Sequence, residues 1–100
     1  ATAVEKLIAA KLFEDDVVAC ASCHSGALLT NNESVDVGTG RKFQVPGLIG
    51  IRNRAPYMHD GCATTLFERF DPSCGGDEHG DISKLSEGDV DDLVAYMDSL

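Results

Sequence analysis

Apolar residues recur at helical spacing near both ends of the chain, and this spacing is lost over most of the middle. In residues 2–13 one stripe consists of Val4, Leu7, Ile8, Lys11 and Leu12, which are all apolar except Lys11. The i, i+3, i+4 spacing is that of one helix face, so we expect an amphipathic helix over residues 2–13. The acidic run Glu14-Asp15-Asp16 ends the pattern.

Two further helices are expected in the second half of the chain. A capping box, Thr65-x-x-Glu68, predicts a short helix that ends near Phe70. A weaker box, Ser86-x-x-Asp89, opens the last helix. The apolar face of this last helix is formed by Val90, Leu93, Val94, Met97 and Leu100.

The segments between the helices are rich in turn-forming residues. Glycines break residues 25–40 into a loop, and Pro46-Gly47 turns residues 43–51 into extended or tightly turned backbone. A glycine-rich loop with His79 precedes the last helix. The pattern predicts an all-α chain with three main helices and long loops, and 100 residues predict a single domain over residues 1–100.

The run Cys20-Ala21-Ser22-Cys23-His24 adds chemistry to this outline. Two cysteines three apart followed by histidine are the attachment signature of a c-type haem. Each thiol adds to one vinyl group of the porphyrin, and His24 supplies an axial nitrogen to the iron. We therefore expect one covalent haem c. A thioredoxin-type Cys-x-x-Cys would follow a strand, and a zinc site would need a second close pair of ligands.

The other two cysteines are Cys62 and Cys74. In an oxidising compartment they would form a disulfide, and the alternative is two free buried thiols. Covalent haem proteins are assembled outside the cytoplasm, so we expect a periplasmic or otherwise extracytoplasmic protein. Its leader has then been removed, or the chain is a piece of a longer protein.

The net charge of -9 argues against a nucleic-acid partner, and no apolar run is long enough to span a membrane. From Asp71 onward the chain has nine acidic residues, and its one lysine or arginine is Lys84. This end is either a solvated surface or a docking surface for a basic redox partner. Arg52 and Arg54 are candidates for binding the haem propionates, and the alternative is ordinary surface arginines.

With these stretches in view, the chain resembles the cytochrome c fold. More narrowly, from about residue 10 to residue 100, it is similar to the C-terminal electron-transfer domain of bacterial di-haem cytochrome c peroxidases and methylamine-maturation enzymes. The runs that carry the resemblance are residues 11–13, 20–26, 36–43 and 45–48, and above all Ala55-Pro56-Tyr57-Met58-His59-Asp60-Gly61. The resemblance implies that Arg41, Tyr57 and His59 lie at the cofactor, with His59 near the haem edge and not on the iron.

The chain departs from this family at two points. It has one haem motif where the family has two, and no methionine stands near Ser73-Cys74-Gly75, where the family places its sixth ligand. His79 is the preferred candidate because its loop is the one in which the family keeps the ligand. Met58 is the runner-up and would give a His/Met iron with a raised potential.

A six-coordinate iron has no open position for substrate, so we expect an electron carrier and not an enzyme. Peroxidase-like catalysis, alone or within a larger di-haem oxidoreductase, is the first alternative. It would need a vacant or displaceable sixth position. A haem-based sensor domain is the second, and fold analogy alone does not decide between them.

Overall fold

The computed structural model describes residues 3–38 and 40–100. Thr2, the expected start of the first helix, and Thr39, within the run 36–43, lie outside the described residues. The elements, with η for a 3₁₀ helix, are α1 (Ala3–Glu14), α2 (Cys20–Cys23), β1 (Ser34–Val35), β2 (Phe43–Gln44), η1 (Ile51–Asn53), η2 (Phe67–Phe70), η3 (Gly76–Glu78) and α3 (Glu87–Asp98).

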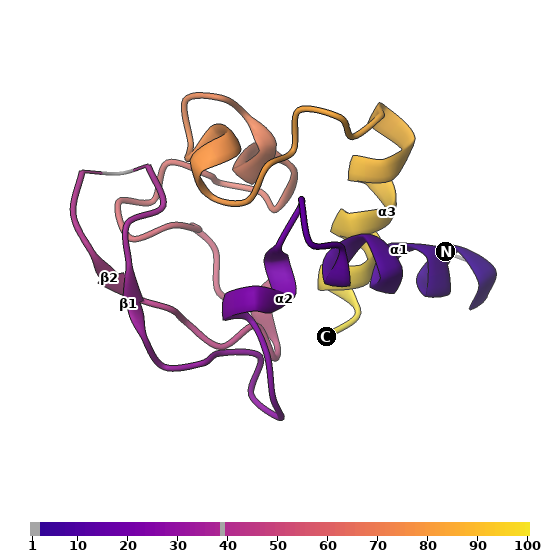
Figure 1. Cartoon of the computed structure of the whole chain (residues 1–100), viewed down its shortest axis with the longest axis horizontal. Helices are drawn as coiled ribbons and strands as arrows, with labels where there is room; N and C mark the ends of the chain where they lie inside the picture. The colour runs from indigo at the N-terminus through magenta and orange to yellow at the C-terminus, as the bar shows by residue number, and fades with distance from the viewer. Residues whose placement is uncertain (1–2, 39) are drawn as a thin grey trace.

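The predicted all-α class is confirmed in its coarse form, since the described residues contain three α-helices and little strand. Strands β1 and β2 pair antiparallel, with Ser34 opposite Gln44 and Val35 opposite Phe43. They lie on the side of the molecule away from α1 and α3 (Figure 1). Each strand has two residues, which is too short for an alternating hydrophobic pattern, so the sequence gives no sign of this pairing.

The core forms where α1 packs against α3 (Figure 1). Phe13 of α1 and Tyr96 of α3 have ring centroids 5.3 Å apart. Phe13, Leu48 and Leu93 form the buried cluster, so a residue from the middle of the chain completes the contact between the two helices. The two helices therefore support the segment that follows α1, which carries the haem motif.

Of the apolar stripe predicted for the first helix, Leu12 packs against the core cluster, whereas the N-terminal members of the stripe do not. Val4, Leu7 and Ile8 are exposed, with Leu7 at 66%, whereas Ala9 and Phe13 are buried. The reason is tertiary: the N-terminal half of α1 extends beyond α3 in Figure 1. Within the described residues, no helix combines the length and the apolar character that crossing a bilayer requires.

The two predicted capping boxes have different outcomes. The box of α3 is present in full, because the Ser86 hydroxyl accepts the Asp89 N–H and the Asp89 carboxylate accepts the Ser86 N–H. The short helix forms as the 3₁₀ helix η2 and not as an α-helix. There the Thr65 hydroxyl accepts the Glu68 N–H at 3.3 Å, but the Glu68 carboxylate binds threonine hydroxyls instead of closing the box.

A disulfide joins Cys62 to Cys74 and closes the segment that contains η2. Cys74 is 2% exposed and lies directly before the loop that carries His79. A cross-link over a segment of this length contributes roughly 3 kcal/mol on the chain-entropy model. The bridge thus fixes the base of the His79 loop.

Candidate haem site

The haem motif forms a single helical turn, α2. Cys20 and Cys23 are at its two ends, and residues three apart lie on the same side of a helix. The turn begins after Ala19, whose backbone is left-handed with φ 62°, and the His24 N–H donates to the Cys20 carbonyl at 3.0 Å. Both thiols and the imidazole are therefore presented from one short turn.

The His24 ring is oriented by the backbone. Its Nδ1–H donates to the Leu29 carbonyl at 3.0 Å, and because a carbonyl only accepts, Nδ1 carries the proton. The other ring nitrogen, Nε2, is left as the metal-binding atom, which is the usual arrangement for a ligating histidine. The loop that supplies the carbonyl lies tight against Gly47, where a Cβ would be 2.7 Å from the Leu28 carbonyl oxygen.

His79 follows η3 in a loop that depends on glycines at both ends. Gly75 has φ +96°, and a Cβ there would be 3.1 Å from both the His79 Cβ and the Val37 carbonyl oxygen. Gly80 has φ +79°, and a Cβ there would overlap the carbonyl oxygen of Val18. The loop is therefore held against the segment directly before Cys20.

His24 and His79 face each other. Their ring centroids are 6.3 Å apart and their planes are inclined by 49°. Two imidazoles that bind one metal ion from opposite sides, through bonds of about 2 Å, have centroids roughly 6 Å apart. The separation of the His24 and His79 rings is therefore compatible with both binding one metal ion, and ligation by either residue stays a prediction.

Both imidazoles are neutral at neutral pH, the form that binds iron. Burial is the main cause of the lowered pKa of each ring. The pKa of His79 falls to about 3, because burial disfavours the charged ring and the positive charge of Arg69 adds to this effect. The His79 Nδ1 is buried without a hydrogen-bond partner among the described residues.

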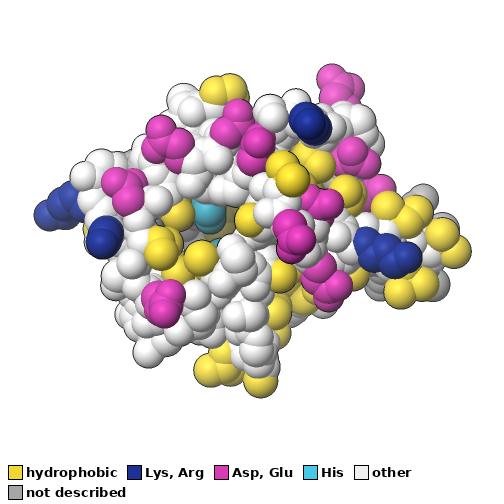
Figure 2. All heavy atoms as spheres, viewed as in Figure 1, with side chains coloured by type: hydrophobic (Ala, Val, Ile, Leu, Met, Phe, Trp, Pro, Cys, Tyr) yellow, Lys and Arg dark blue, Asp and Glu magenta, His cyan; other side chains and the backbone are white. Residues whose placement is uncertain are grey.

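One face of the molecule is hollowed. Figure 2 shows this hollow near the middle of one face, with histidine side-chain atoms inside it and hydrophobic side chains around its rim. Two thiols on one turn, two facing neutral imidazoles and an apolar rim together fit a porphyrin with a metal at its centre. The cofactor class predicted from the motif therefore agrees with the geometry.

Arg69 is the site residue that sequence reasoning missed. It belongs to η2, is half-buried, and donates from Nη2 to the His79 carbonyl. The available signal was its place in the short helix, three residues after the buried Leu66 and beside the half-buried Phe70. A residue at that spacing shares the inward side of the helix.

The runner-up ligand, Met58, lies next to the same loop. Its backbone is left-handed with φ 66°, and its terminal methyl group would be 3.3 Å from a Cβ on Gly75. Met58 and His79 thus pack around one glycine, but it is the His79 ring that faces His24. Ligation by His79 stays a prediction, which this geometry favours.

Several of the other residues predicted to bind the cofactor make contacts away from the His24–His79 pair. His59 is exposed and stacks on Phe43 at 3.6 Å between ring centroids, and the Arg41 guanidinium lies 5.4 Å from the Phe43 ring centroid. Arg54 donates from Nη2 to the carbonyls of Gly47 and Ile49.

Arg52 is exposed, and Tyr57 is half-buried, with its backbone bridged to Ala63. For Arg41, Arg52, Arg54, Tyr57 and His59, contact with the cofactor stays a prediction.

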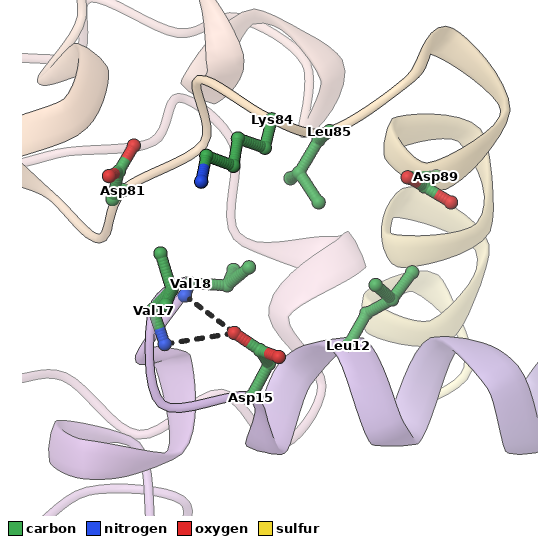
Figure 3. Close-up of a pocket in the computed structure, with 8 residues that line it drawn as sticks. All are labelled: Leu12, Asp15, Val17, Val18, Asp81, Lys84, Leu85 and Asp89. Carbon is green, nitrogen blue, oxygen red and sulfur yellow. Dashed lines mark hydrogen bonds between the residues drawn. The ribbon is translucent and has the colours of Figure 1, made fainter.

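A separate cavity of about 240 Å³ lies between the end of α1 and the segment before α3 (Figure 3). It is lined by Leu12, Asp15, Val17, Val18, Asp81, Lys84, Leu85 and Asp89. Its carboxylates serve local structure, since Asp15 accepts the N–H groups of Val17 and Val18, and Asp81 and Asp89 also accept backbone N–H groups. The cavity lies where residues 15–18, directly before the haem motif, meet residues 81–89, which follow the His79 loop.

Comparison with known proteins begins with sequence. No family model matches the chain. It is 28% identical to hydrazine synthase subunit gamma of Kuenenia stuttgartiensis, over 90% of this chain and 39% of that protein. It is 30% identical to methylamine utilization protein MauG of Methylorubrum extorquens, over 81% of this chain and 30% of that protein. The chain therefore spans well under half the length of either relative.

Solved structures show the same relationship. A structure of Kuenenia stuttgartiensis hydrazine synthase, pressurized with xenon, superposes with a TM-score of 0.90 and 26% identity, over 96% of this chain and 46% of that one. A MauG-like protein associated with microbial copper homeostasis superposes with a TM-score of 0.75 over 100% of this chain and 47% of that one. At 22% identity the second shows the shared fold alone.

These similarities support a cytochrome c-like family and, with the haem motif, a haem cofactor. They also correct one expectation. The prediction of an electron carrier that is not an enzyme is contradicted, because the chain matches a subunit of a synthase, which is an enzyme.

Proposed function

From the facing rings of His24 and His79, we propose that the chain holds one c-type haem and carries electrons as the haem module of a longer redox enzyme. The haem is joined covalently to Cys20 and Cys23 and ligated by both histidines. The single observation that carries this proposal is the 6.3 Å separation of the centroids of the two imidazole rings.

Each residue has a defined task in this proposal. A haem bound here supplies one-electron redox chemistry at its iron. The α2 turn fixes the cofactor in position, and the Leu29 carbonyl holds the proton of His24 on Nδ1. The loop held against Val18 at Gly80 would position His79 as the second ligand. Two neutral ligands on a rigid frame limit the rearrangement that accompanies electron transfer.

The enzymatic context comes from the relatives. One is a subunit of hydrazine synthase and another is a methylamine utilization protein, and each is much longer than this chain. We propose that the remainder of such a protein carries the substrate site and that this module supplies electrons to it or removes them. Peroxidase-like catalysis or gas sensing in the module itself would require His79 to leave the position facing His24.

The proposed location is periplasmic or otherwise extracytoplasmic. The Cys62–Cys74 disulfide supports it, because disulfides persist in oxidising compartments and are rare in the cytosol. Covalent attachment of haem through Cys20 and Cys23 supports the same location.

The proposed external partner is a basic redox protein. Nine acids and one lysine lie from Asp71 onward, within a net charge of -9. Attraction between such a surface and a basic partner accelerates association and is screened by salt. With a basic electron-donor protein, we expect the second-order rate of haem reduction to fall steeply between 10 and 200 mM ionic strength, on the scale of the Debye length. A rate that stays constant or rises with salt would exclude this docking mode.

Covalent haem attachment is tested by removing sulfur atoms in pairs. In the double variant Cys20→Ser, Cys23→Ser, expressed with a haem-attachment system, the intact protein should have the mass of the bare polypeptide. The native chain should carry the added mass of one haem. The thioether bonds form only at these two sulfurs, so the effect should be complete.

The matched control is the double variant Cys62→Ser, Cys74→Ser. It also loses two sulfur atoms, but those of the disulfide, so it should keep the covalent haem while losing stability. A native chain with no added mass, or equal haem loss in both double variants, would refute the proposal.

A further inference from the structure

Arg69 is built into the site in an unusual way. It comes from the segment closed by the Cys62–Cys74 disulfide, and its side chain reaches the His79 loop. Nη2 donates to the His79 carbonyl, while Nη1 is buried with no hydrogen-bond partner among the described residues. Buried polar groups are nearly always hydrogen-bonded, so an unpaired guanidinium nitrogen in this place calls for an explanation.

The positive charge of Arg69 lies beside the residues that define the haem site. Its guanidinium contacts the His79 backbone carbonyl, and the His79 ring centroid is 6.3 Å from that of His24. A Cβ on Gly80 would overlap the Val18 carbonyl oxygen and would be 4.0 Å from the Arg69 Nη2. The guanidinium therefore lies where the His79 loop meets the segment before Cys20.

This charge is incompletely balanced by acids. Asp77 is the carboxylate that acts on Arg69, but it is exposed, and its Oδ1 accepts the Ile82 N–H at 3.0 Å. A purely structural arginine would use its donors on carbonyls or carboxylates, as Arg54 does with two backbone carbonyls. Arg69 instead keeps a cation and a free donor in a region where water screens weakly.

We propose that Arg69 is a positioning residue that anchors His79 through its carbonyl and holds a buried positive charge beside the cofactor, which raises the reduction potential of the haem. This inference rests on the proposed haem site. Reduction by one electron removes one positive charge from the iron, so a nearby fixed cation favours the reduced state. Burial keeps the effect from being screened as it would be at the surface.

The test is a potentiometric titration of the haem-loaded protein at neutral pH, followed by its visible spectrum, with dithionite as reductant and ferricyanide as oxidant. Arg69→Gln should favour the oxidised state by on the order of tenfold, which is a potential about 59 mV lower for one electron. Arg69→Lys keeps the charge and should stay within about threefold of the native equilibrium.

The matched control is Lys11→Gln, which removes the same charge from an exposed position on α1 and should shift the equilibrium by less than about threefold. If Arg69→Gln fails to fold, Arg69→Leu, which needs no hydrogen-bond partner, takes its place. Loss of the low-spin spectrum in the neutral variants, with retention in Arg69→Lys, would support the anchoring of His79.

Two results would overturn the inference: equal shifts of the reduction potential for Arg69→Gln and Lys11→Gln, or a fall of the potential in Arg69→Lys as large as in Arg69→Gln. These failures differ from failure of the proposed function. If the proposed function is wrong, the native chain carries no haem. If only the role of Arg69 is wrong, the protein carries haem but the reduction potential of Arg69→Gln equals that of the native protein.

Discussion

Replacing His79 with alanine should convert the oxidised haem-loaded protein from a low-spin to a high-spin species at neutral pH. The centroid of the His79 ring is held 6.3 Å from that of the His24 ring by a loop fixed at both ends. Removal of the His79 ring would leave the iron of the bound haem without its second protein ligand. We expect the conversion to be nearly complete in the absorption and electron paramagnetic resonance spectra. Added imidazole should restore the low-spin form, because it can enter the space that the side chain leaves.

The matched control is His59→Ala. His59 is exposed and stacked on Phe43, apart from the facing pair, so its removal should leave the spin state unchanged. A low-spin spectrum in His79→Ala without added imidazole would show that another residue, with Met58 first in line, is the native ligand. Conversion of His59→Ala to the high-spin form would instead assign the sixth iron ligand to His59.

The second large effect is expected for Gly80→Ala. Gly80 has φ +79°, where an L-residue costs about 1–2 kcal/mol, and its Cβ would overlap the Val18 carbonyl oxygen. Relieving that overlap requires the His79 loop to move away from the segment before Cys20, at a further cost of about 1–3 kcal/mol. The free energy of unfolding, measured with denaturant, should therefore fall by about 2–5 kcal/mol. The variant should also show a high-spin fraction.

Gly26→Ala separates the two causes. Gly26 also has a left-handed backbone, with φ +77°, but a Cβ there would have no atom within 4 Å. In Gly26→Ala the free energy of unfolding should fall only by the cost of the left-handed backbone, about 1–2 kcal/mol. This variant should keep the low-spin spectrum. Equal losses in the two variants would mean that the contact between Gly80 and Val18 does not position His79.

The features that could be predicted from sequence are those that local chemistry determines. The α2 turn follows from the spacing of Cys20, Cys23 and His24, and the start of α3 follows from the reciprocal hydrogen bonds of Ser86 and Asp89. Each depends on residues within one helical turn, so no knowledge of distant packing was needed.

The features that could not be predicted depend on contacts between distant segments. The hydrophobic stripe of α1 wrongly predicted burial of Val4, Leu7 and Ile8, because the position at which α3 packs on α1 decides which residues are covered. Sequence reasoning left both Met58 and His79 as candidates, since both lie in irregular segments. The choice between them depends on how the loop is held at Gly75 and Gly80. Arg69 was missed because its inward direction depends on a 3₁₀ turn inside a disulfide-closed segment.

The most direct test of the account is the absorption spectrum of the oxidised, haem-loaded native chain at neutral pH. The facing imidazoles of His24 and His79 predict a low-spin spectrum with no far-red band of thioether ligation. A clear far-red band, which would indicate ligation by Met58, or a high-spin spectrum, which would indicate an open position, would contradict it.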